Sequence, residues 1–167
     1  MDTLQDTAVL IRPIAPTDFE LERDFVAGLS PATAYQRLMS ARRPDAAELS
    51  RWTRIDRRCE GALIAVVQVD GRARQVGVAR YAMQPGDDEA EFALVIGDAW
   101  QGRGLGHDLL RRLIELARAS GVRRLFGTTL SDNRPMLRLA RRLGFRLSRA
   151  PGGAIITLLA LDLADAA

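Results

Sequence analysis

Three strand-like runs joined by turn residues are the feature that most constrains how this chain can fold. The runs are Ala62–Val69, Val76–Met83 and Ala90–Ile96. Asp70-Gly71 and Pro85-Gly86-Asp87-Asp88 separate them, and connections of this length and composition favour β-hairpins. Successive hairpins predict an antiparallel meander, not parallel strands joined by crossover helices.

An amphipathic helix is expected soon after the meander, from about Gly104 to Ser120. Its apolar positions recur at helical spacing, and Gly121 ends it. Before the meander, Val9–Arg12 predicts a strand, and capping residues and prolines predict helices that begin near Pro16, Ser30 and Pro44. After the amphipathic helix, the pattern predicts a strand, a helix and two closing strands at Leu125–Thr129, Asn133–Leu143, Phe145–Ser148 and Ala154–Leu161.

Length and composition narrow the class of protein. The 167 residues suit one domain over residues 1–167 with a substantial core. The acidic, polar start at Met1–Asp6 is no signal peptide, and the longest apolar run is too short to span a bilayer, so we expect a cytoplasmic protein that does not contact membranes. The single cysteine, Cys59, excludes an internal disulfide framework and a cysteine-rich zinc site, and we expect no metal site.

The basic residues exclude two further classes. All 24 are arginine, and a Walker-type phosphate loop needs a lysine. The net charge is only +3, and no basic stretch is interleaved with aromatic residues, so we expect no nucleic-acid partner.

The loop from Gln101 to Gly106 is the strongest candidate for a binding site. Its three glycines let backbone amides approach a ligand closely, and the following helix start adds free donors and partial positive charge. A phosphate or pyrophosphate is the natural guest. A Rossmann fingerprint that starts at Gly102 fails, because its last glycine falls on His107.

Read from Gln101, the loop Q-x-x-G-x-G resembles the acyl-CoA pyrophosphate loop of the GNAT acetyltransferases. The helix that Asn133 opens and the following Gly144-Phe145 resemble a second motif of that family. The resemblance implies an α/β fold: a mixed, mostly antiparallel seven-stranded sheet with helices on both faces. Further matches resemble the branch of bacterial protein-lysine acetyltransferases that act on acyl-CoA synthetases, at Leu29-Ser30-Pro31, Tyr35, Arg37, Trp52–Asp56, Glu91-Phe92-Ala93 and Asp132–Leu137.

The resemblance also implies a reaction and the residues that perform it. Acetyl-CoA would donate its acetyl group to a primary amine. The loop Gln101, Gly102, Arg103, Gly104, Leu105, Gly106 and the adjacent His107 would hold the pyrophosphate. The backbone of Leu94, Val95 and Ile96, with Asn133, would hold pantetheine; Asn133 is equally a candidate N-cap.

A base must remove a proton from the acceptor, because an alkyl ammonium has a pKa near 10.4. Glu91 occupies the position where the resembled branch keeps this base, and partial burial would raise its pKa; Glu89 and Asp88 are weaker candidates. Ala140 stands seven residues after Asn133, where many relatives have a tyrosine that acts as general acid. We therefore expect an unprotonated thiolate to leave, with Tyr81 as the fallback acid.

The acceptor is left open between a protein lysine and a small amine, with the lysine favoured. A noncatalytic acyl-CoA-sensing module is the alternative from another class. The arginines at positions 134, 138, 141 and 142 share one helix face, which is either solvated or meets an anionic group. An oligomer is compatible with the sequence.

Overall fold

The computed structural model describes residues 7–38, 44–152 and 155–163. Its strands are β1 (Leu10–Pro13), β2 (Glu60–Val69), β3 (Arg72–Met83), β4 (Glu89–Ile96), β5 (Arg124–Leu130), β6 (Arg146–Arg149) and β7 (Ile156–Asp162). Its helices are α1 (Phe19–Ala27), α2 (Pro31–Leu38), α3 (Ala46–Thr53), α4 (Leu105–Ala119) and α5 (Arg134–Arg142), with short 3₁₀ turns at η1 (Pro16–Asp18) and η2 (Asp98–Trp100).

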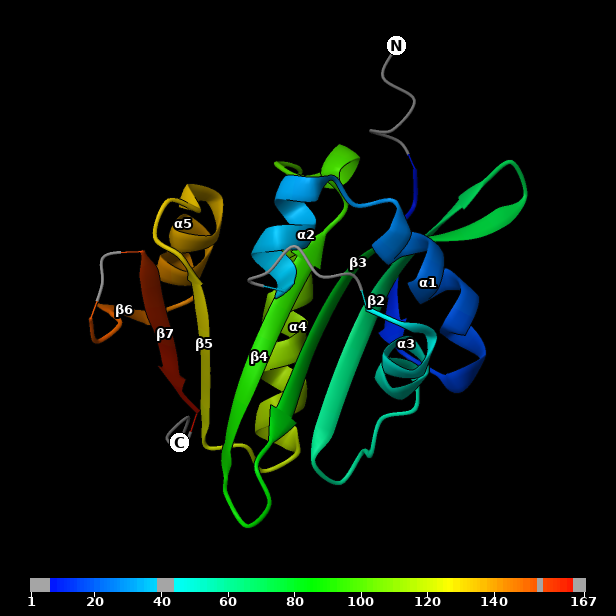
Figure 1. The fold of residues 1–167 in the computed structure, drawn as a ribbon. Coiled ribbons are helices and arrows are strands. Elements are labelled where there is room, and N and C mark those ends of the chain that lie inside the picture. Colours follow the sequence, from blue (N-terminus) through cyan, green and yellow to red (C-terminus); the bar gives the residue numbers. More distant parts are fainter. Residues whose placement is uncertain (1–6, 39–43, 153–154, 164–167) are drawn as a thin grey trace.

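The strands form one seven-stranded sheet in the order β1-β2-β3-β4-β5-β7-β6, as Figure 1 shows. All neighbours pair antiparallel except β4 and β5, which are parallel. The predicted mixed, mostly antiparallel sheet is confirmed. The first hairpin turns at Asp70 and Gly71, both at positive φ (51° and 76°), as a two-residue turn between twisted strands requires.

The largest difference from the predicted boundaries is at β3, which begins at Arg72 and not at Val76. Arg72, Ala73 and Arg74 are exposed and lack an apolar alternation, but they pair with the end of β2 across the tight turn. The hairpin geometry therefore extends the strand where side-chain patterning gives no signal. The predicted start of the last strand, at residue 154, lies outside the described residues.

Helices cover both faces of the sheet, as predicted. On one face α4 buries Leu109, Leu110 and Leu113 completely, and α5 adds Ala140 to the same core. On the other face α1 and α3 pack Phe25, Val26 and Leu49 against the sheet. In Figure 1, α4 lies behind the sheet while α1, α2 and α3 lie in front of it. No helix in the described part of the chain is long and apolar enough to cross a membrane.

The parallel pair β4–β5 is short, and this shapes the functional region. It pairs only at Glu89↔Arg124, Ala90↔Leu125 and Glu91↔Phe126. Beyond Glu91 the strands diverge, with β4 remaining on β3 and β5 remaining on β7 (Figure 1). In the described parts of the chain, the backbone of β4 after Glu91 therefore has no strand partner on its β5 side, which leaves backbone polar groups there for a ligand.

Candidate active site

The start of α4 is an uncapped helix N-terminus next to the diverging strands. Gly102 and Gly104 have φ of 75° and 86°, a region that glycine enters without steric cost. Gly104 is the N-cap residue, and no side chain of the described chain caps the helix there. The first amides of α4, from Leu105 onward, have no intrahelical acceptor, and the helix dipole adds partial positive charge. This is the geometry of an anion site.

The surroundings of Gly106 show which elements border this anion site. A Cβ at this position would lie 3.4 Å from Leu139 of α5, 3.6 Å from Ile96 and 3.7 Å from Leu94. The start of α4 therefore borders both α5 and the stretch of β4 that has left β5. An extended ligand whose phosphates lie at the α4 amides can continue directly along the open edge of β4.

Polar contacts fix the connection between β4 and α4. Gln101 donates from Nε2 to the Ile96 carbonyl at 3.0 Å and contacts Thr33 Oγ1 at 3.4 Å. Asp98 accepts hydrogen bonds from the Ser30 amide, the Ser30 hydroxyl and the Thr33 hydroxyl at 2.7 to 2.9 Å. Burial alone would raise the pKa of Asp98, but these hydrogen bonds outweigh it and hold the pKa below its usual value. Asp98 thus ties the start of α2 to the loop.

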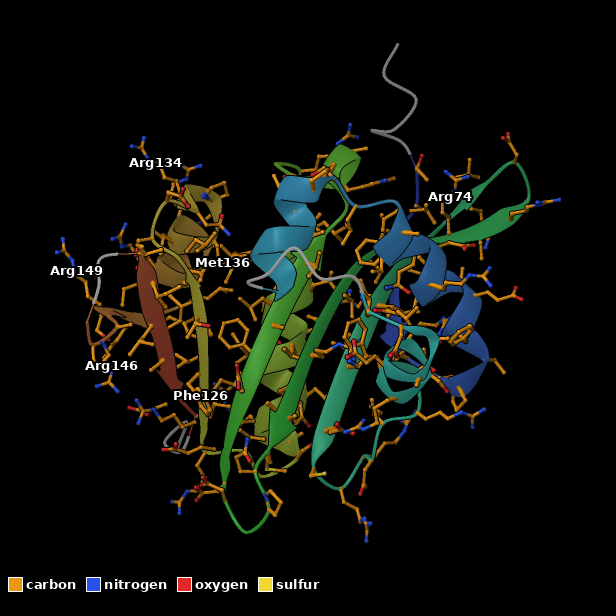
Figure 2. All side chains as sticks on the ribbon, in the orientation of Figure 1. Arg74, Phe126, Arg134, Met136, Arg146 and Arg149 are labelled. Carbon is orange, nitrogen blue, oxygen red and sulfur yellow. The ribbon has the colours of Figure 1, made fainter. Side chains whose placement is uncertain are left out.

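The other predicted loop and helix residues lie around this site. The guanidinium of Arg103 stacks 5.5 Å from the ring centre of Trp100, and His107 is half-buried beside Asp108. Asn133 caps α5, because its side-chain oxygen accepts from Met136 N, while its Nδ2 donates to Thr129 Oγ1 at 3.2 Å. The arginines on α5 are exposed, and Figure 2 shows Arg134 projecting outward from the top of this helix.

Glu91 lines a cleft of about 310 Å³ on the α1–α3 face. The strand register places Glu60, Ala82 and Glu91 in one row across β2, β3 and β4, and places Ala62, Arg80 and Ala93 in the next. Residues two apart on a strand share a face, so all of these side chains point to the same side of the sheet. Trp52 and Ile55 close the cleft from the end of α3 and the residues after it.

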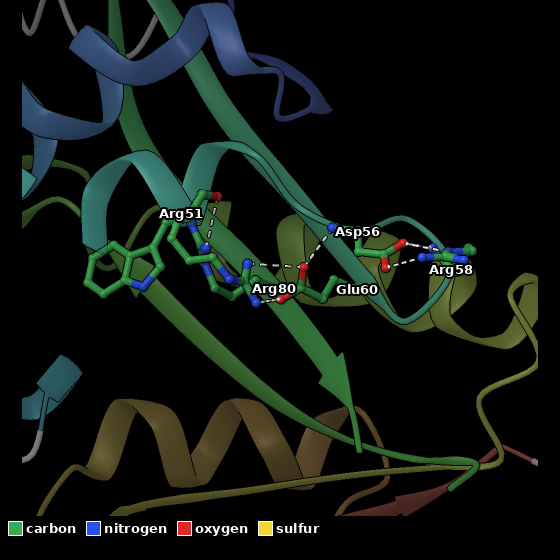
Figure 3. Close-up of polar contacts among 6 residues, drawn as sticks. Arg51, Asp56, Arg58, Glu60 and Arg80 are labelled. Atoms are coloured by element: carbon green, nitrogen blue, oxygen red, sulfur yellow. Dashed lines mark hydrogen bonds and ion pairs between the residues drawn. The ribbon is translucent and has the colours of Figure 1, made fainter. Parts of the chain in front are cut away.

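The other charged groups of the cleft are paired. Arg51 contacts both Glu60 oxygens, at 2.6 and 3.2 Å, and Glu60 also accepts from the Asp56 amide at 2.7 Å. Figure 3 shows this network and the Arg58–Asp56 pair beside it. Arg80 donates to the Trp52 carbonyl at 3.2 Å and lies 3.4 Å from Glu22, which is completely buried. Burial lowers the pKa of the Arg80 guanidinium, and Glu22 opposes that shift.

Comparison with known proteins agrees with this geometry. The acetyltransferase (GNAT) domain model matches residues 8–146. The chain belongs to the GNAT acetyltransferase family. It is 39% identical over 144 residues to an acetyltransferase of Pseudomonas aeruginosa, which covers 86% of this chain and 77% of that protein.

Two further relatives carry the name Pat. The acetyltransferase Pat of Mycolicibacterium smegmatis is 33% identical over 154 residues, covering 88% of this chain but only 44% of that longer protein. The crystal structure of the GNAT domain of S. lividans PAT superimposes with a TM-score of 0.80 at 26% identity, covering 93% of this chain and 96% of that domain.

This GNAT domain is an acetyl-CoA-dependent N-acetyltransferase, and acetyl-CoA is its co-substrate. The residues present suit that molecule. The uncapped α4 start offers amides and positive charge to a pyrophosphate, and the open edge of β4 offers backbone groups to an amide-containing chain.

Two expectations about the chemistry need correction. Glu91 is exposed, not partly buried, because it lies at the mouth of the cleft beside the small Ala82 and Ala93. Tyr81 does not share the face of Glu91. It pairs with Phe92 and Gly61, is 3% exposed in the α4-side core, and its ring occupies the space where a Gly61 side chain would stand. Alternation along β3 makes this unavoidable.

Sequence reasoning missed the polar groups that shape the cleft. Glu60, Arg80 and Glu22 come from three different elements and share no motif. Counting alternate positions along the predicted strands would have put Arg80 on the same face as Ala82. Only the register across β2, β3 and β4 brings Glu60 and Glu91 into one row.

Proposed function

We propose that this GNAT domain transfers the acetyl group of acetyl-CoA to the side-chain amine of a protein lysine, with Glu91 as the general base. One observation carries this proposal. Glu91 is the last residue at which β4 pairs with β5, so its carboxylate stands where the cleft meets the diverging strands. An acceptor amine in the cleft and a thioester along β4 would meet beside it.

The chemistry assigned to each group follows from its position. Glu91 accepts the proton of the acceptor ammonium, directly or through water, and the neutral amine attacks the thioester carbonyl carbon. A backbone amide of Leu94, Val95 or Ile96 stabilises the negative charge that develops on the carbonyl oxygen. The carbon–sulfur bond breaks, an amide forms, and CoA leaves as the thiolate.

The same proposal assigns the remaining cofactor contacts. The amides of Gly102, Gly104, Leu105 and Gly106 hold the pyrophosphate, and Arg103 and His107 add donors at its edge. Gln101 supports the loop through the Ile96 carbonyl. Asn133 keeps its role as the α5 cap and orients pantetheine with its remaining amide hydrogen.

A lysine suits the cleft for two reasons. Trp52 and Ile55 provide an apolar surface for its methylenes, and the cleft arginines, Arg51 and Arg80, are both paired with carboxylates. Among the residues that the structure describes, the ammonium would therefore meet a carboxylate without an ion pair at Glu91, and the guanidinium groups that line the cleft are paired. The early-helix motifs that resemble the protein-lysine branch, at Leu29-Ser30-Pro31 and Trp52–Asp56, agree with this acceptor.

The decisive experiment incubates the protein with labelled acetyl-CoA and a bacterial lysate, then separates proteins from small molecules. We expect label on protein lysines, retained after acid precipitation and lost with the Glu91→Gln variant. Label confined to small amines would replace the protein acceptor with a small-molecule one. Absence of amine-dependent thiol release with either fraction would contradict the reaction itself.

A further inference from the structure

One side chain holds both the backbone and the ring of Trp52, which forms a wall of the cleft. Arg80 Nη1 donates to the Trp52 carbonyl at 3.2 Å, and the guanidinium carbon lies 5.5 Å from the centre of the indole ring (Figure 3). The carbonyl belongs to the last turn of α3, where carbonyls lack intrahelical donors and the helix dipole attracts a cation. The ring contact is a cation–π interaction.

Arg80 is itself held in place by Glu22 of α1. Its Nη2 lies 3.4 Å from Glu22 Oε1, and Glu22 accepts a 2.7 Å hydrogen bond from Gln75 Nε2 on the same strand as Arg80. On either side Arg80 pairs with Ala62 and Ala93, whose small side chains leave room for the guanidinium to lie beneath α3. The side chain is 16% exposed, so it is held inside the protein and does not move freely at its surface.

The hydrogen bonds that the structure describes at the adjacent rim of the cleft do not involve Arg80, although its charge interacts with those of Glu60 and Arg51. Glu60 binds Arg51 of α3 and the Asp56 amide, and therefore holds the connection between α3 and β2 by its own contacts. Weakening the contacts of Arg80 should consequently make Trp52 more mobile and more accessible to solvent while leaving this rim in place.

We infer that Arg80 is a positioning residue for the acceptor: it sets the place of Trp52, and through Trp52 it determines how tightly the acceptor amine binds beside Glu91. This inference rests on the proposed function, because it takes the cleft to be the acceptor site. Within the described part of the chain, the side-chain contacts of Arg80 go to Trp52 and Glu22 and not to the α4 start or to residues 94–96 of β4, so we expect acetyl-CoA binding to be independent of the Arg80 side chain.

The matched variants are Arg80→Lys and Arg74→Lys. Both replace an arginine of β3 by lysine, but Arg74 is exposed near the hairpin tip (Figure 2). Lysine keeps the charge of Arg80 and loses the planar fork that reaches Glu22 and the Trp52 carbonyl together. Trp52→Ala removes the indole ring and leaves the Arg80–Glu22 pair in place. If Arg80→Lys impairs folding, this second variant still tests whether the Trp52 ring contributes to acceptor binding.

The first measurement follows Trp52 directly and needs no acceptor. The chain has two tryptophans, so a Trp100→Phe background leaves Trp52 as the only one. Compared with the Trp100→Phe parent, we expect acrylamide to quench Trp52 more strongly in the Arg80→Lys variant. We expect the Arg74→Lys variant to show the same quenching as the parent. Unchanged quenching in the Arg80→Lys variant would overturn the hold of Arg80 on Trp52.

The second measurement is kinetic, with Nα-acetyl-lysine amide as acceptor at saturating acetyl-CoA. We expect Arg80→Lys to raise the acceptor KM about tenfold, the loss of about one charged contact, with the KM for acetyl-CoA unchanged. In a Trp52→Ala background, the Arg80→Lys substitution should raise the acceptor KM little further, because the effects of coupled residues are not additive. Additive effects, or a fall in kcat alone, would contradict a role through Trp52.

The outcomes separate this inference from the proposed function. No turnover of any amine by the wild type would count against the proposed function, and quenching would still decide whether Arg80 holds Trp52. Turnover that depends on Glu91 but is indifferent to Arg80→Lys and Trp52→Ala would leave the proposed function standing and remove the inference.

Discussion

Glu91 differs from the neighbouring carboxylates in having no ion pair among the residues that the structure describes. Glu60 is held by Arg51, Glu22 by Arg80 and Gln75, and Glu89 lies 3.5 Å from Arg124. A carboxylate already held by a guanidinium is less free to turn toward an acceptor amine. At the scale of single residues, we therefore expect Glu91, and not its neighbours, to act as base.

The first prediction is that Glu91→Gln slows acetyl transfer by about 10²–10⁴-fold near pH 7, because the proton acceptor is lost while the shape is kept. Steady-state kinetics measure the rate, and calorimetry should find acetyl-CoA affinity unchanged. The deficit should narrow as pH rises, since more of the acceptor amine is already neutral.

Glu89→Gln is the matched control, because Glu89 lies two residues earlier on the same face of β4 and is paired. We expect its rate to stay close to that of the wild type. A larger loss at Glu89 than at Glu91 would move the base to Glu89.

The second prediction concerns the leaving group. Ala140 is completely buried and has no proton to donate, and Tyr81 faces the opposite side of the sheet from Glu91. CoA should leave as the thiolate, since a thiol with a pKa near 8.5 is a good leaving group. The pH–rate profile should rise to a plateau, and Tyr81→Phe should leave its shape unchanged. A descending limb that Tyr81→Phe abolishes would restore Tyr81 as the acid.

At the scale of elements, α4 has similar glycines at its two ends with different surroundings. Gly104 and Gly121 have φ of 86° and 87°, and a Cβ at either would meet nothing within 4 Å. Gly104 lies at the uncapped start, next to the open edge of β4, and Gly121 follows the far end of the helix. The two positions therefore separate backbone strain from ligand binding.

The third prediction compares Gly104→Ala with Gly121→Ala. Both should lower the free energy of unfolding by about 1–2 kcal/mol, the cost of a left-handed residue with a side chain. Only Gly104→Ala should also weaken acetyl-CoA binding, because its methyl and the strained loop disturb the amides at the α4 start. Chemical denaturation and calorimetry measure the two quantities. Equal acetyl-CoA affinity in both variants would remove the pyrophosphate from this loop.

At the scale of the whole molecule, the first strand is tied to the following 3₁₀ turn by a partly buried ion pair, in which Asp18 is buried and Arg12 is about one third exposed. Arg12 of β1 contacts both oxygens of Asp18 at 2.7 Å, and the Ala15 amide donates to the same carboxylate. The Arg12 hydrogen bonds lower the pKa of Asp18, and burial only partly opposes them. Folding therefore favours the ionised carboxylate. This stabilisation is present above the unfolded-state pKa of about 3.9 and is lost as pH falls through the folded-state pKa.

The fourth prediction is that Asp18→Asn lowers the free energy of unfolding by about 1.5–3 kcal/mol at pH 7, the value of hydrogen bonds to a charged group. The difference from the wild type should shrink as pH falls below about 4, where the unfolded state takes up the proton first, and the charge-dependent part should be lost once the pH is below the lowered folded-state pKa of Asp18. Urea denaturation at several pH values measures it. Asp24→Asn is the control, since its pair with Arg23 is exposed and should contribute about 0–1 kcal/mol. A pH-independent difference at Asp18 would contradict the linkage.

Much of the fold was predictable because its signals are local. Turn residues at Asp70-Gly71, helical spacing from Leu105 onward and the cap at Asn133 each act within a few residues of chain, and the turn and the two helices form where expected. The start of β3 was missed because exposed Arg72 and Arg74 carry no pattern. The assignment of Glu91 and the loop glycines to catalysis and binding stays a prediction, now with a geometry that suits it.

The order of strands and helices, the Gly-rich start of α4 and the resemblance to an acetyl-CoA-dependent family could be read from the sequence, because each depends on short motifs of neighbouring residues. Which side chains meet was set by the assembled sheet and its helices. Strand register put Glu60, Ala82 and Glu91 in one row and turned Tyr81 to the other face. It also brought Glu22, Arg80 and Trp52 together from α1, β3 and α3. Such contacts join residues far apart in the chain, and no local pattern encodes a pairing that exists only once the sheet and its covering helices have assembled.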